Sequence, residues 1–260
     1  MSKELYNELP RPTFRWMKVN HLELERQEAP YLPSVDIENR TVGDVTVSFY
    51  QGNGLDDLGD FAGASGESLR DALNHSMNGC SVTVPEGAKG SVRLTYNVSE
   101  AVPYLAAQLK IEAAANSEVE VYLLFEGDAK NGAVNIAEYI EAAKGAKVTV
   151  KKVQFNGEHV RHIEHRYVRS GENSDVRYVN AELGSRAVIL YYKTDLDGAE
   201  SKFGSRAMYI GHDEQVLDFS YWVAQKGEKS HADILATGAL TDRSKKNFRG
   251  TIDFLRGCKK

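Results

Sequence analysis

The sequence predicts an all-β protein whose core is a parallel β-helix, preceded by a small irregular or α+β N-terminal region. From Ser81 onward, short strands of alternating residues follow tight turns, and no helical crossover separates them. One marker residue per strand gives steps of 29, 28, 12, 28, 16 and 16 residues, so intervals near 28 divide into pieces of 12 to 16. The markers are Val119, Val148, Val176, Val188, Val216, Ala232 and Phe248. A repeat of this kind is typical of stacked coils.

Small residues at recurring corners favour the same fold, because they fit where a chain turns sharply. The corners are Gly132–Ala133, Gly145–Ala146, Gly198–Ala199 and Gly238–Ala239. A β-sandwich is the competing fold, since its turns also recur, at about 8 to 12 residues. The longer spacing favours the β-helix.

The first 40 residues are expected to be irregular, because four of the six prolines lie there. Phe14 and Trp16 are expected to pin this arm to the body of the protein. The alternation in Val42–Tyr50 predicts a strand, and the Gly- and Asp-rich stretch 51–66 predicts a connection.

The segment Ser68–Asn78 is the best helix candidate. Ser68 can cap it, and Gly79 is a natural stop. Its apolar face would consist of Leu69, Ala72, Leu73 and Met77. Since the pattern changes after Gly79, we place a boundary between an N-terminal region, 1–80, and the β-helix core, 81–260.

Eight segments of the core predict strands, each after a turn of small or charged residues. They are 91–96, 118–125, 147–155, 175–183, 187–196, 215–223, 231–236 and 247–255.

Composition limits the class of function. The chain has 260 residues and a net charge of −5, which argues against a nucleic-acid binder with a general basic face. Two cysteines form no disulfide framework, and no run approaches the roughly 20 apolar residues of a membrane helix. No signal-peptide core is present at the start. We expect a cytoplasmic protein without nucleic-acid or membrane partners.

The densest polar cluster is the heptapeptide HVRHIEH at 159–165. On a strand, one face would hold His159, Arg161 and His165. The other face would hold His162, Glu164 and Arg166. An arginine sits on each face, and neither gathers three clean ligands in a zinc spacing. We therefore predict no metal site and interpret the segment as a solvated strand.

No catalytic motif stands out, since the serine elbow and the Walker A loop are both missing. Asp56, Asp57 and Asp60 lack the spacing of a calcium loop and predict a solvated acidic turn. Cys80 and Cys258 are expected to be unreactive thiols. Several aromatic residues are expected to pack in the core or in ladders rather than to stack on bases. They are Tyr191, Tyr192, Phe219, Tyr221 and Trp222.

Several motifs together resemble one known family. They are Gln215-x-x-Asp218, the small-residue stretch Ile234–Leu240, Phe248-Arg249-Gly250, Gly79–Gly87, Leu183–Ser185 and Pro12–Trp16. The chain resembles the SufB/SufD family of iron–sulfur cluster assembly proteins over nearly its whole length. This resemblance implies a right-handed parallel β-helix and a non-enzymatic scaffold role in the SUF system. It also implies two partners, a SufB-type paralogue and a SufC-type ABC ATPase. We expect no cofactor on this chain, and a nascent iron–sulfur cluster only in the full complex.

Two departures from the family pattern favour a SufD-like assignment. Gln225 stands where family members usually carry a histidine, and Val176–Leu183 lacks the cysteine of SufB-type chains. Family chains also continue past Phe248–Gly250 into further coils and a helical tail that grips the ATPase. We therefore expect a C-terminally incomplete β-helix that binds SufC weakly and self-associates through its exposed end. The apolar residues of that end are Phe248, Ile252, Phe254 and Leu255.

Two alternative functions stay open, because a fold alone does not determine a function. A carbohydrate-processing β-helix enzyme would need clustered carboxylates in a cleft, or a basic side chain beside a metal. A β-helix interaction module would display a surface without any cluster chemistry.

Overall fold

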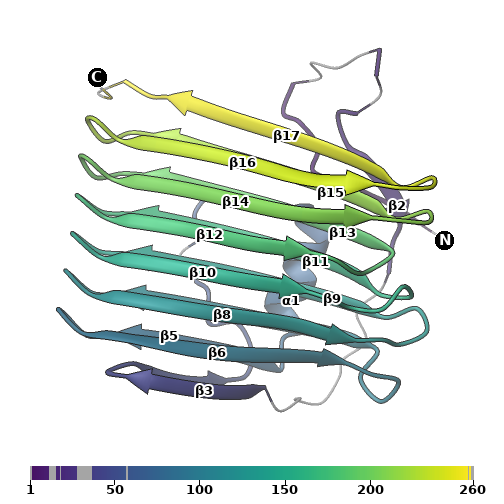
Figure 1. The fold of residues 1–260 in the computed structure, drawn as a ribbon, viewed down its shortest axis with the longest axis horizontal. Helices are drawn as coiled ribbons and strands as arrows, with labels where there is room; N and C mark the ends of the chain where they lie inside the picture. The colour runs from purple at the N-terminus through teal and green to yellow at the C-terminus, as the bar shows by residue number, and fades with distance from the viewer. Residues whose placement is uncertain are drawn as a thin grey trace.

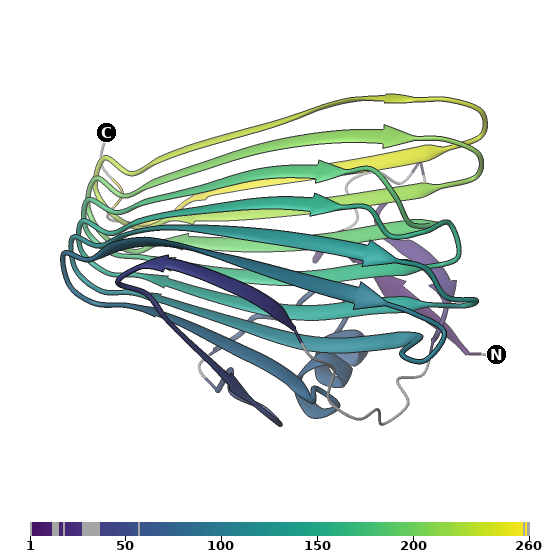
Figure 2. The same cartoon turned by 60° about the horizontal axis from the view of Figure 1, so that its bottom comes forward.

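The structure is a computed structural model that describes residues 2–11, 16–17, 19–27, 37–56, 58–256 and 258. Its body is a β-solenoid of about six turns, in which parallel coils stack on one another (Figure 1). Each turn adds one strand to each of two sheets, which form the two walls of a flattened tube (Figure 2). The predicted all-β fold with a parallel β-helix core is therefore confirmed.

The first wall is a 7-stranded sheet. Its spatial order is β16 (His231–Leu240), β14 (Lys202–Gly211), β12 (Asp175–Glu182), β10 (Lys147–Gln154), β8 (Glu118–Gly127), β6 (Lys89–Val98) and β3 (Glu38–Gly43). The second wall is an 8-stranded sheet. Its spatial order is β17 (Lys245–Phe254), β15 (Val216–Gln225), β13 (Ala187–Leu196), β11 (Arg161–Ser170), β9 (Ala133–Ala142), β7 (Tyr104–Ala113), β5 (Asn78–Val84) and β4 (Thr46–Tyr50). All pairs from β5 to β17 are parallel, and β3 and β4 add antiparallel edges.

The spacing of the predicted strands has a simple structural origin. Val119 pairs with Val148, and Val148 pairs with Val176, so steps of 29 and 28 residues correspond to full turns within one sheet. The short step from Val176 to Val188 crosses from β12 to β13, which belong to different sheets. A turn of about 28 residues therefore contains two strands.

The core fills the space between the walls with apolar side chains from alternate positions of strands β5 to β15. Aromatic rings stack between successive coils, as in the pair Tyr96–Phe125, whose ring centroids lie 5.0 Å apart. Tyr192 and Tyr221 continue such a ladder at 5.1 Å, and Phe219 is buried beside them. Tyr192, Phe219 and Tyr221 therefore pack in the core as predicted, whereas Tyr191 and Trp222 occupy outward positions and are only partly buried.

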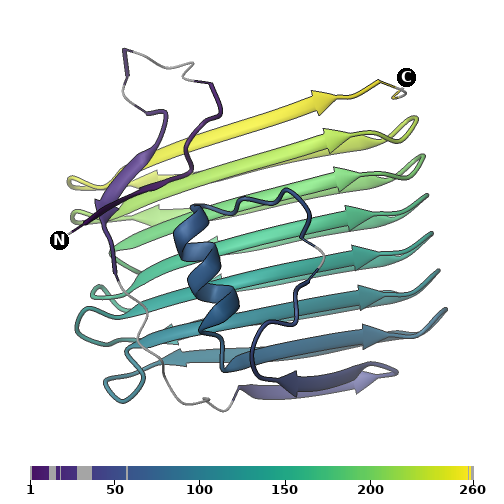
Figure 3. The ribbon, with the colours of Figure 1, turned by 180° about the vertical axis from the view of Figure 1, so that it is seen from behind.

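The outer face of the 8-stranded sheet is covered by N-terminal elements (Figure 3). Helix α1 (Gly66–Asn74) places Leu69 and Ala72 against Ala137 and Tyr139. A small antiparallel pair, β1 (Lys3–Tyr6) and β2 (Leu22–Glu25), packs beside it over β11 and β13. No described element covers the outer face of the 7-stranded sheet (Figure 2).

The helix differs in detail from its prediction. Its cap is Ser65, whose backbone is extended and whose side chain accepts a hydrogen bond from the backbone N–H of Ser68. Ser68 therefore lies in the first turn, and the predicted cap was placed three residues too late. Gly79 is not the helix stop, because it lies inside β5, which begins at Asn78.

The predicted strand Val42–Tyr50 is confirmed only from Thr46, where β4 begins, because the chain turns at Gly43 and sends β3 and β4 to different sheets. Gly43 adopts φ of +84°, and a Cβ there would lie 2.3 Å from the carbonyl oxygen of Lys89. Only glycine tolerates both conditions.

The N-terminal arm is more regular than predicted, since β1, β2 and the start of β3 fall within it. Trp16 does not pin it, because this side chain is 98% exposed. Phe14 lies outside the described residues. The buried side chain of Tyr6 packs against Ile163 and Ile189 instead.

Four of the parallel strands were missed, namely β5, β7, β9 and β14. β9 is buried on both faces for most of its length, which weakens its alternation, whereas β7 alternates from Gln108 to Ala113 and was overlooked. Gly238–Ala239 is not a corner, since it lies within β16. Among the described residues, no helix has the length and apolar character needed to cross a membrane.

Candidate functional site

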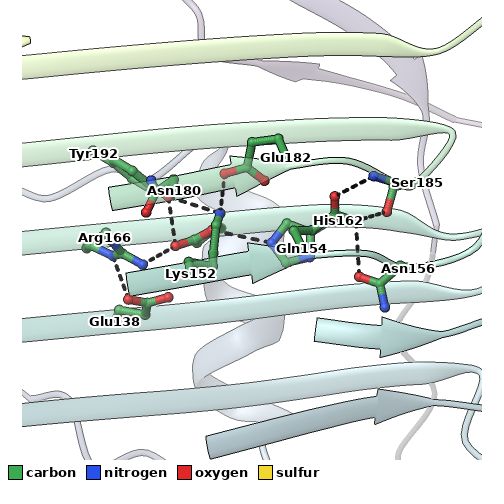
Figure 4. A network of polar contacts seen from close by, with 12 residues as sticks. Glu138, Lys152, Gln154, Asn156, His162, Arg166, Asn180, Glu182, Ser185 and Tyr192 are labelled. Carbon is green, nitrogen blue, oxygen red and sulfur yellow. Dashed lines mark hydrogen bonds and ion pairs between the residues drawn. The ribbon is translucent and has the colours of Figure 1, made fainter. Parts of the chain in front are cut away.

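Strand β11 carries the densest polar cluster of the sequence into the interior of the molecule (Figure 4). His162, Glu164 and Arg166 occupy the lumen-facing positions and are fully buried. His165 faces the other way and is also fully buried, and its Nδ1 accepts a hydrogen bond of 2.8 Å from the backbone N–H of Ala64. The prediction of a solvated strand is therefore wrong, because the N-terminal cover seals the face that points away from the lumen.

Glu164 is the centre of an ionic network inside the solenoid. Lys152 and Arg166 both donate to its carboxylate. The hydroxyl of Tyr192 donates to Oε1 at 2.8 Å, and Nε2 of His162 lies 3.3 Å from Oε2. Four side chains from three strands thus converge on one carboxylate.

Two further carboxylates extend the network along the axis of the solenoid. Nε of Arg166 donates to Glu138 on β9 at 2.5 Å. Nζ of Lys152 lies 2.7 Å from Oε1 of Glu182 on β12. The guanidinium of Arg166 also lies over the ring of Tyr178, 4.3 Å from its centroid, which adds a cation–π contact.

The network contains three carboxylates and two permanent cations, so one carboxyl group can remain protonated. Although burial opposes ionisation, Lys152 and Arg166 hold the pKa of Glu164 well below its usual value. Burial raises the pKa of Glu138 to about 8, so this group holds a proton at neutral pH. Burial also lowers the pKa of His162 to about 4, and its imidazole is therefore neutral.

The arrangement is closed to ligands from solvent, because the side chains of its charged members are fully buried. Each carboxylate is committed to a cation, so none is free to act on a substrate. Within the described ranges, no group of three or more His, Cys, Asp or Glu residues is placed to hold a metal ion. The network is therefore internal to the solenoid.

The other candidate residues are dispersed. His159 precedes β11, lies on the surface and has Nδ1 2.8 Å from Oδ2 of Asp128. Cys80 is buried in the core, and burial raises the pKa of its thiol to about 12, so it is unreactive. Cys258 is partly buried, and its thiol lies 3.9 Å from the side-chain oxygen of Gln225.

The acidic loop before the helix forms no ion site in the described residues. Asp60 is exposed and pairs with Lys193 at 2.6 Å. Asp56 lies in the same loop, and Asp57 lies outside the described residues.

Sequence reasoning missed Lys152, Glu138 and Glu182, although the sequence contains a signal for Lys152. In KVTVKKVQ, Lys152 falls in phase with the buried Val148 and Val150, whereas Lys151 falls in the exposed phase. A charged residue in the lumen-facing phase of a strand requires a buried partner. Its partners lie on neighbouring strands and become visible only once the register is known.

The last coil presents a different kind of surface. Its lumen-facing residues Phe248, Ile252 and Phe254 are 43%, 42% and 69% exposed, because no described coil lies beyond them. Lys246 stands among them, with Nζ 3.7 Å from the ring centroid of Tyr209. Burial lowers the pKa of Lys246 to about 8.

Comparison with known protein families assigns the solenoid. A family model described as "SUF system FeS cluster assembly, SufBD core domain" matches residues 96–260. The chain belongs to the SufB/SufD family. A search of the curated proteins found no match.

The SufBD core match begins within β6 and contains the whole ionic network, from Glu138 to Tyr192. It also contains Asp218 and Arg249, two residues of the motifs that predicted the family. Helix α1 and the β1–β2 pair lie before it. The membership supports a role in SUF iron–sulfur cluster assembly.

Proposed function

We propose that this chain is a non-catalytic scaffold subunit of the SUF assembly machinery, more SufD-like than SufB-like, that acts in the cytoplasm. It would pair with a SufB-type paralogue and work beside a SufC-type ABC ATPase. The nascent iron–sulfur cluster is then the cargo of the complex rather than a resident group of this chain. The observation that carries the proposal is the SufBD core match over residues 96–260, which covers most of the solenoid.

The placement of the charged residues supports a scaffold over an enzyme. A carbohydrate-processing enzyme requires two carboxyl groups that flank a bond of the substrate in an open cleft. In this chain Glu138, Glu164 and Glu182 lie in the lumen and are bound to cations. No observation on the described residues favours the carbohydrate alternative.

The SufD-like assignment rests on two positions. Gln225 ends β15 with its side chain toward the lumen, 5% exposed, where an amide replaces the imidazole common in the family. Strand β12 contains no cysteine. An amide and a strand without thiols make poor ligands for iron, so the cluster is expected on the paralogue's side of the complex.

Co-purification tests the pairing directly. The tagged chain should retain a SufB-type partner when both are expressed together, and should retain a SufC-type ATPase only weakly. Recovery of the chain alone, with neither protein, would contradict the scaffold role. Such a chain would fit the third alternative, an interaction module with other partners.

A further inference from the structure

The bare outer face of the 7-stranded sheet carries a stripe of exposed apolar side chains. Val153, Val179, Met208 and Ile210 are 42%, 40%, 56% and 52% exposed. They lie on the neighbouring strands β10, β12 and β14, and Val153 and Met208 share one register row through Ala181. A contiguous apolar surface of this kind on a folded protein commonly marks an interaction site.

The stripe is hollowed into a groove of about 370 Å³. Its walls run from Arg93 on β6 through Tyr122 on β8 and Val153 on β10 to Met208 on β14. The groove therefore crosses the strands and follows the axis of the solenoid. Four strand spacings give a length of about 19 Å, which about 13 residues of α-helix would span.

In the same molecule, a helix covers apolar residues on the outer face of the 8-stranded sheet. Helix α1 lies across the strands of the 8-stranded sheet (Figure 3). Its apolar residues Leu69 and Ala72 pack on Ala137 and Tyr139. An amphipathic helix laid across the strands is thus a packing that this solenoid already uses.

Three cations share one register row of the outer face, and two of them, Arg93 and Lys151, line the groove. Arg93, Lys151 and Arg206 occupy the same register row, on β6, β10 and β14. Lys151 pairs with Glu120 at 2.7 Å, and Arg206 pairs with Asp233, both at the surface. Arg93 forms no ion pair with any described residue. Exposed pairs of this kind are weak, at about 0 to 1 kcal/mol, so a ligand carboxylate can compete for these cations.

The whole outer face is positive although the chain is not. Its outward residues on β6 to β16 include seven cations, namely Lys89, Arg93, Lys147, Lys151, Arg177, Lys202 and Arg206. They include five acids, namely Glu118, Glu120, Glu126, Asp175 and Asp233. Seven minus five gives +2 for this face, against −5 for the chain. A second copy would bring the same positive face, so an acidic partner is favoured.

We propose that this groove binds an amphipathic α-helix of a partner protein, with the apolar side of the helix on Val153, Val179 and Met208. Acidic residues along one flank of the helix face Arg93, Lys151 and Arg206. The site is formed by this chain alone and does not depend on the SUF role proposed above.

The probe is a fluorescent 15-residue peptide, stapled as a helix, with leucines along one face and glutamates along one flank. A twin peptide carries lysines in place of the glutamates. In fluorescence anisotropy, the acidic peptide should bind the full chain at least about tenfold more tightly than its twin. A higher salt concentration should weaken binding of the acidic peptide, because its charge contacts with the protein are exposed.

Variants locate the binding. Met208→Asp and Arg93→Glu should each lower the affinity for the acidic peptide by about tenfold or more. Both residues are exposed, so the fold should survive, and circular dichroism checks this. Val42→Asp is the matched control, because Val42 is an exposed apolar residue of the same sheet outside the groove. It should leave binding unchanged.

Three results would overturn the proposal. The first is equal affinity for the two peptides. The second is binding that Met208→Asp does not affect. The third is a concentration-dependent dimer, seen by sedimentation, that Met208→Asp abolishes while the acidic peptide fails to bind. That last result would assign the groove to a second copy.

Discussion

Lys152 is the residue on which the charge balance of the interior depends. It is fully buried and contacts both Glu164 and Glu182. Its neighbour Lys151 has the same chemistry on the opposite face of the strand and pairs with Glu120 at the surface. Comparing the two lysines therefore shows how burial changes the contribution of a lysine ion pair to stability.

We predict that Lys152→Met lowers the free energy of unfolding by about 3 to 5 kcal/mol, because Glu182 and Glu164 lose a buried cation. Lys151→Met should cost less than about 1 kcal/mol, since it removes only a surface pair. Urea denaturation of both variants measures the difference. Equal losses in the two variants would show that the ionic network contributes no more than a surface contact.

The titration of Glu138 makes the stability of the folded protein depend on pH in a defined direction. Its pKa rises from 4.5 to about 8 on folding, so the native state holds a proton that the unfolded chain has lost. This contribution to stability is fully present below 4.5 and is lost as the pH rises through about 8. His162 acts in the opposite direction, because its pKa falls from 6.5 to about 4. Above 6.5 its contribution to stability is fully present and no longer changes with pH.

The stability of the native chain should therefore fall between about pH 6.5 and pH 8. Glu138→Gln keeps an acceptor for Arg166 and removes the titration, so its stability should fall less over this range. Glu182 is present in both proteins, so the difference between them isolates Glu138. Urea midpoints measured along this range would contradict the account if both proteins showed the same slope.

At the scale of the elements, alternation located several strands with one solvated face and did not locate β9, which is buried on both faces for most of its length. β8, β10 and β12 show the alternation of a half-exposed strand, and the sequence located each of them. β9 lies under α1, and its outward Ala137 and Tyr139 and its inward Glu138 interrupt the alternation, whereas β7 alternates and was overlooked. The interior network was unpredictable for a related reason, since its partners are set by register between coils.

The N-terminal arm and the last coil are joined by one buried carboxylate. Asp218 on β15 accepts hydrogen bonds of 2.6 Å from Asn7 of the arm and from Arg249 of β17. Arg249 also donates to the carbonyl oxygen of Val19 in the arm at 2.8 Å. Two motif residues that indicated the family thus tie together the two ends of the described chain.

We predict that Asp218→Ala loosens both ends together, because it leaves Arg249 buried without a carboxylate. Amide hydrogen exchange, read by mass spectrometry, should accelerate in β1 and in β17. Asp233→Ala is the control, since it removes a carboxylate whose ion pair lies at the surface of β16. Faster amide exchange in only one of the two ends would show that Asp218 does not hold them together.

At the scale of the whole molecule, the solenoid has a sealed interior, one covered wall, one bare wall and an exposed last coil. In the described chain, β16 and β17 each pair with a neighbour on one side only. Open strand edges with apolar side chains promote pairing with other chains. The last coil is therefore the place where association is expected.

We predict that the 260-residue chain self-associates through this end. Ile252→Lys combined with Phe254→Lys should reduce the association, because both side chains are exposed lumen-facing residues of β17. Light scattering at high protein concentration measures it. If the unaltered chain is a monodisperse monomer, its last coil does not mediate self-association.

Anaerobic assembly of the SUF complex tests the central claim most directly. The chain is combined with a SufB-type paralogue, a SufC-type ATPase and a cysteine desulfurase, and iron and acid-labile sulfide are measured on the purified species. We expect cluster on the complex that contains this chain, little on a mixture that lacks it, and none on the chain alone. Equal cluster content with and without the chain, or a stoichiometric cluster on the chain by itself, would contradict the scaffold account.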